Sequence, residues 1–271
     1  MIYRDIHGID IDMINTLNED KESNFLIICD HASNRIPIEY KNLGLDEEIL
    51  STHIAYDIGV KEVASHLAEH LKCPLVMSNF SRLLIDPNRG IDDPTLIMKI
   101  SDGKIIRGNE EISFLKNCSE KKHRVASYYN VYHNKISELI NRSLKKNIFP
   151  AIISIHSFTP LFGGNKRSTE LGILWDSDNR LPDIFFSYFN KNYKDIIIGN
   201  NKPYTGRMKN DTLYRHGTKQ GLANILIEIR QDLINDSVKQ IFFSKLIAQP
   251  LLESKNDVNL FKKKFYKSLA R

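Results

Sequence analysis

The stretch LIICDHASNRIP, residues 26–37, decides the fold that we expect for this chain. Four apolar residues, Leu26 to Cys29, run directly into Asp30 and His31. A short apolar run without polar alternation is typical of a strand that is buried on both faces of a sheet. In open α/β sheets, ligands bind beyond the carboxyl ends of the strands. The stretch therefore predicts a central strand that delivers His31 to a ligand-binding edge.

Other apolar runs have the same character, and helical patterns separate them. We expect buried strands at 24–29, 74–78, 150–155, 195–200 and 223–229. Apolar residues at steps of three and four predict a helix over 57–72, and similar patterns predict helices over 121–146 and 231–253. This alternation indicates an α/β fold with a mixed, mostly parallel central sheet and helices on both faces. Because no linker or repeat interrupts the sequence, we expect one domain over residues 1–271.

The composition narrows the class of protein. Hydrophobic residues make up 41% of the chain, which is enough for a sizeable core, and the net charge is only +5. Basic residues are scattered apart from a Lys-rich tail, so we expect a small anionic ligand and no nucleic-acid partner. The three cysteines lie far apart, and we find neither a signal peptide nor an apolar stretch of membrane-spanning length. These features favour a cytoplasmic protein that makes no membrane contact; they do not decide its oligomeric state.

A second histidine and a glutamate follow the pattern of the opening stretch. The run PAIISIHSFTP (150–160) ends in His156 and Ser157, so two histidines follow two buried strands and favour a metal site. In ILIEIRQDL (225–233), Glu228 lies inside an apolar strand, where a carboxylate needs a cation, a metal or a raised pKa. Arg230 is expected on the same face, so a buried ion pair with Glu228 is the structural alternative to a general base at a metal-bound water.

A turn and a probable helix start supply further polar candidates. The segment SRLLIDPNRG (81–90) carries Arg82, Asn88 and Arg89, which can form a surface salt-bridge loop or a clamp for a carboxylate. Asp57, in HIAYDIGV, lies where capping of a helix alone would justify it. Tyr204, in NKPYTG, is a candidate for lining a pocket or for a turn.

Taken together, these stretches resemble the N-formylglutamate amidohydrolase family. The matching segments occur in order between about residue 24 and residue 235, and they read CDHASNRIP, HIAYDIG, SRLLIDPNR, ISIHSFTP, LGILWDSDNRLP, NKPY and IEIRQDL. The family is grouped with zinc-dependent, carboxypeptidase-like hydrolases. The resemblance therefore implies a phosphorylase/hydrolase-like α/β fold and a hydrolase that uses one zinc ion to cleave the amide bond of a small anionic N-acyl amino acid such as N-formylglutamate.

The resemblance also implies a role for each candidate residue. His31 and His156 would bind zinc, and Glu228 would be the general base and then the proton donor. Arg82 would polarise the scissile carbonyl, and Asn88 and Arg89 would hold a substrate carboxylate. We also place Ser157, Tyr204 and Arg230 among the residues that bind substrate.

One position departs from the pattern of the wider group of zinc hydrolases. That group has a zinc-binding glutamate three residues after the first histidine, and Asn34 occupies this position here. We expect Asp57 to be the third ligand. Asp30 is the second candidate, and it could instead orient a histidine. Two alternatives remain: the same chemistry on another N-acyl amino acid, small peptide or cell-wall fragment, and a non-catalytic carboxylate-binding relative that has lost its metal.

Overall fold

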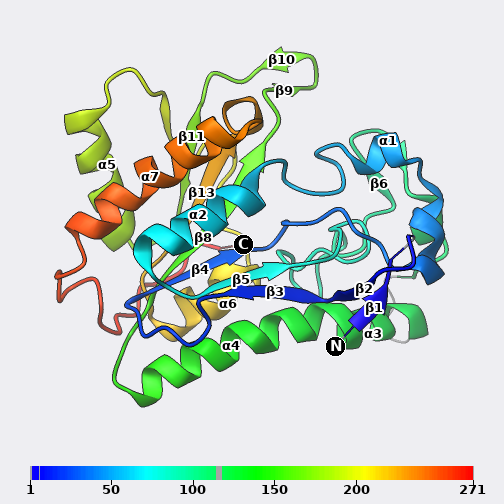
Figure 1. Ribbon diagram of the computed structural model, residues 1–271, viewed down its shortest axis with the longest axis horizontal. Helices are drawn as coiled ribbons and strands as arrows, with labels where there is room; N and C mark the ends of the chain where they lie inside the picture. The colour runs from blue at the N-terminus through cyan, green and yellow to red at the C-terminus, as the bar shows by residue number, and fades with distance from the viewer. Residues whose placement is uncertain (1, 6, 114–117, 271) are drawn as a thin grey trace.

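A seven-stranded sheet forms the centre of the molecule in the computed structural model, which describes residues 2–5, 7–113 and 118–270. The strand order is β12-β11-β13-β8-β4-β5-β3 (Figure 1). In chain order these strands are β3 (Ile14–Leu17), β4 (Phe25–Cys29), β5 (Leu75–Ser78), β8 (Ala151–Phe158), β11 (Leu171–Leu174), β12 (Ile198–Asn200) and β13 (Asn224–Arg230).

The sheet is mixed and mostly parallel, as the sequence predicts. The neighbours β13, β8, β4 and β5 run in the same direction. Strand β3 is antiparallel to β5 at one edge, and β11 is antiparallel to β13 near the other edge. The four parallel strands at the centre therefore bring their carboxyl ends to one side of the sheet.

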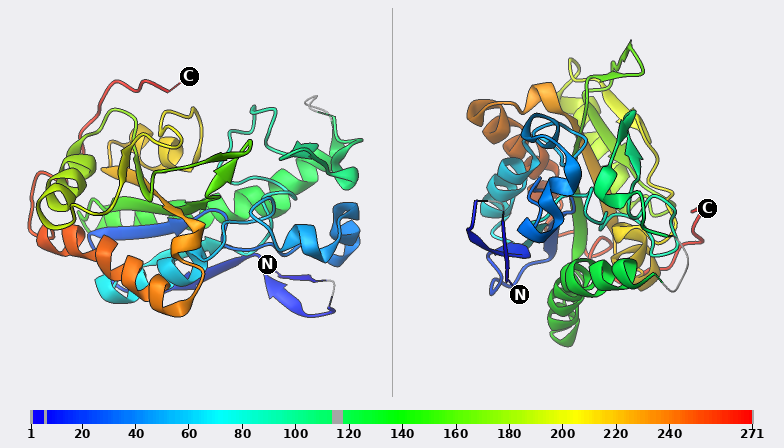
Figure 2. Two further views of the ribbon diagram at one scale, coloured as in Figure 1. Left: turned by 90° about the horizontal axis from the view of Figure 1, so that it is seen from above. Right: turned by 90° about the vertical axis from the view of Figure 1, so that its right-hand side faces the viewer.

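Helices cover both faces of the sheet, which confirms the α/β fold (Figures 1 and 2). Helices α2, α5 and α7 lie over one face, and α4 lies under the other. The helices are α1 (Glu47–Leu50), α2 (Val60–Leu71), α3 (Ser119–Arg124), α4 (Asn130–Lys145), α5 (Arg180–Asn192), α6 (Thr212–His216) and α7 (Ser237–Glu253). None of the helices in the described part of the chain is long and apolar enough to cross a membrane.

Strand β4 shows why these strands carry no polar alternation. All five of its residues are buried. Ile27 belongs to the core under α2 and α7, whereas Leu26 and Ile28 belong to the core that α4 covers. Because successive side chains point to opposite faces, a strand that is covered on both sides must be apolar throughout.

Several predicted elements differ from the structure. The helix expected over 121–146 consists of α3 and α4, joined by a π-helical turn at Val125–Tyr129. The helix expected from residue 231 begins only at Ser237. The strand expected at 195–200 is the short edge strand β12, which is parallel to β11 and does not lie in the centre. Strands β3 and β11 were not predicted, because β3 reads INTL and β11 is only four residues long with a glycine. Helix α5 was not predicted either.

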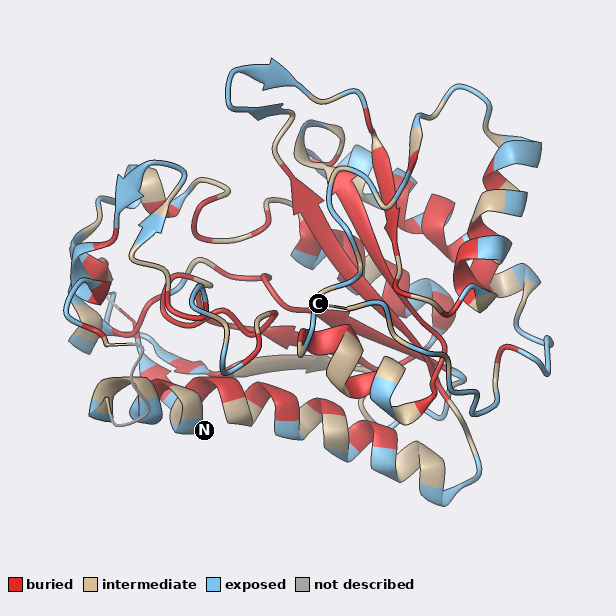
Figure 3. Cartoon of the chain, turned by 180° about the vertical axis from the view of Figure 1, so that it is seen from behind, coloured by how far each residue is buried: buried red, intermediate tan, exposed pale blue. Residues whose placement is uncertain are grey.

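Three short hairpins complete the fold. They pair β1 (Ile2–Arg4) with β2 (Asp10–Asp12), β6 (Ile100–Ser101) with β7 (Lys104–Ile105), and β9 (Leu161–Phe162) with β10 (Asn165–Lys166). The β6–β7 and β9–β10 hairpins are largely exposed and stand on either side of the carboxyl ends of the buried strands (Figure 3). Residues of both hairpins line a cavity at this edge of the sheet.

Candidate metal centre

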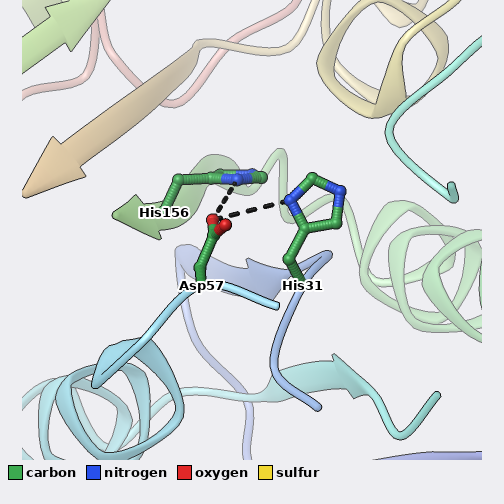
Figure 4. Close-up of side chains that lie close together, drawn as sticks. All are labelled: His31, Asp57 and His156. Carbon is green, nitrogen blue, oxygen red and sulfur yellow. Dashed lines mark hydrogen bonds and ion pairs between the residues drawn. The ribbon is translucent and has the colours of Figure 1, made fainter. Parts of the chain in front are cut away.

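Three buried side chains converge at the carboxyl edge of the sheet. His31 follows β4, Asp57 precedes α2, and His156 lies inside β8 (Figure 4). One ligand atom from each residue lies within 4.8 Å of the other two, which is a geometry that can hold a metal ion. The sequence places His156 after its strand, whereas β8 continues to Phe158 and makes His156 part of the strand.

Hydrogen bonds fix the ring orientation of His31. Its Nε2 lies 2.7 Å from Oδ1 of the buried Asp86, and its Nδ1 contacts the Arg82 guanidinium. Arginine only donates hydrogen bonds, so Nδ1 must present a lone pair and Nε2 must carry the proton that Asp86 accepts. The same Nδ1, which accepts from Arg82, also faces Asp57, whose Oδ2 is 3.5 Å away.

His156 is held in the same way by a different carboxylate. Its Nε2 lies 3.0 Å from Oδ2 of Asp30, and its Nδ1 lies 2.9 Å from Oδ2 of Asp57. Burial alone would lower the pKa of His156, but the hydrogen bonds to Asp30 and Asp57 outweigh this effect and raise the pKa to about 10. A metal bound by Nδ1 would replace the proton there, so metal binding would compete with protonation of the ring.

Asp57 supplies the oxygen of the group. Its Oδ1 accepts a hydrogen bond from Arg82, and its Oδ2 accepts the backbone N–H of Ser157 at 3.2 Å. Burial raises the pKa of Asp57, but the charge of Arg82 and the hydrogen bond from His156 hold it well below the usual range. Two imidazole nitrogens and one carboxylate are a donor set that catalytic zinc sites use, and a carboxylate behind each histidine is the usual means of orienting such ligands. These residues therefore fit a divalent metal.

Asn34, which occupies the expected glutamate position, points away from this group. Its side-chain amide donates to the carbonyl oxygen of Leu50 at 2.9 Å. Asp30, the second candidate for the third ligand, hydrogen-bonds the far nitrogen of His156 and also accepts from the Thr212 hydroxyl at 2.6 Å. Asp30 thus orients a histidine, and Asp57 is the acid that lies with both histidines.

Glu228 lies on β13 directly opposite His156 in the parallel register of β8 and β13. It is 7% exposed, and its Oε2 is buried without a hydrogen-bond partner among the described residues. Burial, assisted by the charge of Asp57, raises the pKa of Glu228 to about 7 against the opposing effect of His156. The carboxyl group is therefore poised to exchange a proton near neutral pH.

The residues of the predicted clamp lie beside this group. Arg82, Asn88 and Arg89 line the same cavity of about 590 Å³ as the three metal-binding candidates and Glu228. Asn88 Oδ1 accepts the backbone N–H of Thr212 at 3.3 Å, so its amide N–H groups are directed to other acceptors. Volumes of 300–1,000 Å³ are typical of small-molecule sites.

Ser157 and Tyr204 also line the cavity, but their polar groups have protein partners. The Ser157 hydroxyl donates to the carbonyl of Ile58 at 2.9 Å, and the Tyr204 hydroxyl accepts from Arg167 at 2.9 Å. These contacts fix the two side chains in the cavity wall.

Arg230 is not among the residues that line the cavity, so its place among the substrate-binding residues stays a prediction. Its guanidinium pairs with Asp232 at 2.8 Å and with Glu170 at 3.7 Å. These carboxylates lie beyond the end of β13 and on the segment before β11, and they draw the side chain outward. The alternative of an ion pair between Arg230 and Glu228 is therefore not formed either.

Sequence reasoning gave no role to three residues that lie at the site. Asp86 anchors His31, Thr212 joins Asn88 to Asp30, and Asp211 lines the cavity. The buried Asp86 follows the apolar run LLI, which is the same signal that singled out Asp30. Asp211 and Thr212 lie in a polar segment whose sequence carries no comparable signal.

The fold and the site define an α/β protein with a buried group that can hold a metal ion inside a polar cavity. Comparison with known families makes the assignment specific. The chain belongs to the N-formylglutamate amidohydrolase family, which it matches over residues 23–235. Among curated proteins, none matches this chain.

Two solved structures resemble this one over most of their length. The crystal structure of gene product Atu2144 from Agrobacterium tumefaciens has 31% sequence identity and a TM-score of 0.84, with 91% of this chain and 96% of that chain covered. The N-formylglutamate amidohydrolase from Ralstonia eutropha has 17% identity and a TM-score of 0.62, with 88% and 99% covered. The second similarity, at such low identity, concerns the fold alone.

Proposed function

We propose that this protein hydrolyses the amide bond of an N-acyl acidic amino acid such as N-formylglutamate. The family name supplies the class of substrate. The observation that carries the proposal is the cavity that places the His31, Asp57 and His156 group beside the unpartnered carboxyl of Glu228. A group that can hold a metal and a carboxyl with a raised pKa are the two parts that metal-assisted hydrolysis needs.

The metal would be held by Nδ1 of His31, Nδ1 of His156 and the carboxylate of Asp57, and we propose zinc. When bound, zinc supplies Lewis acidity that activates water at neutral pH and polarises a carbonyl. The carboxylates of Asp86 and Asp30 keep both rings in place by accepting their Nε2 protons.

Glu228 moves the protons of the proposed reaction. As a carboxylate, it removes a proton from the attacking water, and as a carboxylic acid it returns that proton to the leaving nitrogen. Its partnerless, buried Oε2 is free for both steps. Arg82, whose guanidinium donates a hydrogen bond to Asp57, would stabilise negative charge on the acyl oxygen.

The substrate carboxylate would bind to Asn88 and Arg89. The amide nitrogen of Asn88 and the guanidinium of Arg89 are donors on the wall of the cavity. An anion bound there pairs with a cation that never loses its proton. This arrangement favours N-acyl amino acids, which carry a carboxylate, over neutral amides.

A substrate panel tests the proposal and separates it from its closest rivals. Purified protein would be assayed with N-formyl, N-acetyl and N-succinyl derivatives of glutamate and aspartate, and with small peptides and cell-wall fragments. We expect the highest kcat/KM for N-formylglutamate. Turnover of a different substrate with no turnover of N-formyl amino acids would assign the same chemistry to another substrate.

Metal content and one variant distinguish an enzyme from a non-catalytic relative. Protein purified without chelator or metal-affinity resin should carry about one zinc per chain. Glu228→Gln should keep that metal and lose turnover by at least about 100-fold, as expected for loss of a general base. Glu62→Gln, on the exposed face of α2, is the matched control and should retain full activity. Normal turnover by Glu228→Gln would contradict the role of Glu228.

A further inference from the structure

Asp211 is a buried carboxyl in the cavity that the proposed reaction does not use. It is only 4% exposed and lines the cavity together with Arg89 and Glu228. Its Oδ1 accepts the backbone N–H of Tyr214 at 2.7 Å and so caps helix α6. Its Oδ2 makes no hydrogen bond to any residue that the structure describes. Capping accounts for Oδ1 of this cavity-lining residue and leaves Oδ2 without a donor from the described residues.

The segment that carries Asp211 packs directly on the proposed carboxylate-binding residues. The N–H of Thr212 is bonded to Asn88 Oδ1 at 3.3 Å, and Arg89 Nη1 lies 3.8 Å from the sulfur of Met208. Asn210 is so close to Gly90 that a Cβ on the glycine would lie 2.9 Å from the Asn210 Cβ. The cavity wall therefore sets an acceptor, Asp211, beside the donors of Asn88 and Arg89.

A charged carboxylate in a side chain that is only 4% exposed is costly unless donors reach it. Burial raises the pKa of Asp211 to about 7, although the capping bond and the charge of Arg89 act in the opposite direction. A ligand that brings a hydrogen-bond donor to Oδ2 would favour the charged carboxylate and remove this penalty. Oδ2 of Asp211 thus lacks a hydrogen-bond donor, and Asp211 lies next to the residues that would bind an anion.

An N-acyl amino acid has the matching chemistry. Its carboxylate and its amide N–H are attached to the same carbon, so an acceptor must lie beside the carboxylate-binding donors to reach the N–H. We propose that Asp211 accepts the amide N–H of the substrate and so selects secondary amides over esters of the same shape. This inference rests on the proposed function and adds a determinant of specificity to it.

Binding of a matched pair of ligands tests the inference. N-formylglutamate and its ester analogue 2-formyloxyglutarate differ only in the N–H, which the ester replaces with an oxygen. Titration calorimetry on the zinc-loaded Glu228→Gln variant measures binding without turnover. Because only the amide can donate a hydrogen bond to the charged carboxylate of Asp211, we expect the amide to bind about 10- to 100-fold more tightly than the ester.

The second measurement repeats the two titrations with Asp211→Asn added to the Glu228→Gln protein. Asparagine keeps an oxygen for the cap of α6 but removes the charge, and its amide can donate to the ester oxygen. We expect the preference for the amide to fall to within about threefold. Asp236→Asn, which changes the equivalent capping residue of α7 outside the cavity, should keep the full preference.

Each outcome bears on the inference. Equal binding of amide and ester by the Glu228→Gln protein would overturn it, even if Asp211→Asn failed to fold. An amide preference that survives in folded Asp211→Asn would also overturn it. If no N-acyl amino acid binds at all, the proposed function fails and the role of Asp211 fails with it.

Discussion

A stacked pair of buried histidines behind the carboxylate-binding residues makes the stability of this protein sensitive to acid. His133 Nε2 lies 3.0 Å from the carbonyl oxygen of Pro87, and His133 Nδ1 lies 2.9 Å from His216 Nε2. A carbonyl only accepts, so His133 Nε2 carries a proton and its Nδ1 accepts from His216. His216 Nδ1 is buried without a partner among the described residues. Both rings are therefore neutral in the folded protein.

The sign of the pH dependence follows from these pKa values. Burial lowers the pKa of His133 well below 6.5 and lowers that of His216 from 6.5 to about 4. The unfolded chain therefore binds protons that the folded chain does not bind. The contribution of His216 to stability is fully present above pH 6.5 and is lost as the pH falls toward 4. Between pH 7.5 and pH 5 this loss amounts to about 2 kcal/mol for His216 alone.

The assay compares urea unfolding of the parent and of His216→Asn at pH 7.5 and pH 5. The asparagine amide can still donate to His133, but it does not titrate. We expect the loss of unfolding free energy between the two pH values to be about 2 kcal/mol smaller in His216→Asn than in the parent. The exposed His123 supplies the control, and His123→Asn should behave like the parent. An identical pH dependence in the parent and in His216→Asn would refute the reasoning.

Three further predictions concern the metal and the core. Asp86→Asn removes the charge behind His31 and should weaken metal binding about 10- to 100-fold, measured by competition with a chromogenic chelator, whereas Asn34→Ala should leave metal affinity unchanged. Removing the metal with a chelator should lower the unfolding free energy by about 2.7 kcal/mol relative to protein at a free metal concentration of 100 Kd, and a midpoint insensitive to metal would contradict the site. Ile153→Ala, in the core under α2, should cost about 2–5 kcal/mol in chemical denaturation, with a value below 1 kcal/mol contradicting the packing described.

The sequence predicts the central strands because a buried strand appears in the chain as a run of apolar residues. Strands β4, β5, β8 and β13 lie within about three residues of their predicted bounds, since each is built around a run of apolar residues. The edge strand β3 and the short β11 were missed, because INTL and LGIL look like many loop segments. Their pairing depends on neighbours that are far away in the chain.

The same contrast applies to the site. His31, His156 and Glu228 could be chosen from the sequence, because a polar residue at the end of or inside an apolar run is conspicuous. Arg230 satisfied the same rule, but its guanidinium pairs with Glu170 and Asp232 and it is not among the residues that line the cavity. A pattern in the chain can indicate that a side chain is on a strand, but its partner is decided by residues that the pattern does not include.

The sequence by itself determined the α/β class, the four parallel strands at the centre of the sheet and two histidines at its carboxyl edge. The tertiary structure alone decided how the departure at Asn34 is resolved. Asn34 turns to Leu50, and Asp57, 26 positions beyond His31 in the chain, brings its carboxylate to both histidines. The physical reason is that a metal-binding group is defined by the distances between its ligand atoms. Those distances depend on the packing of β4, β8 and the loop before α2 against one another, which no local pattern of residues records.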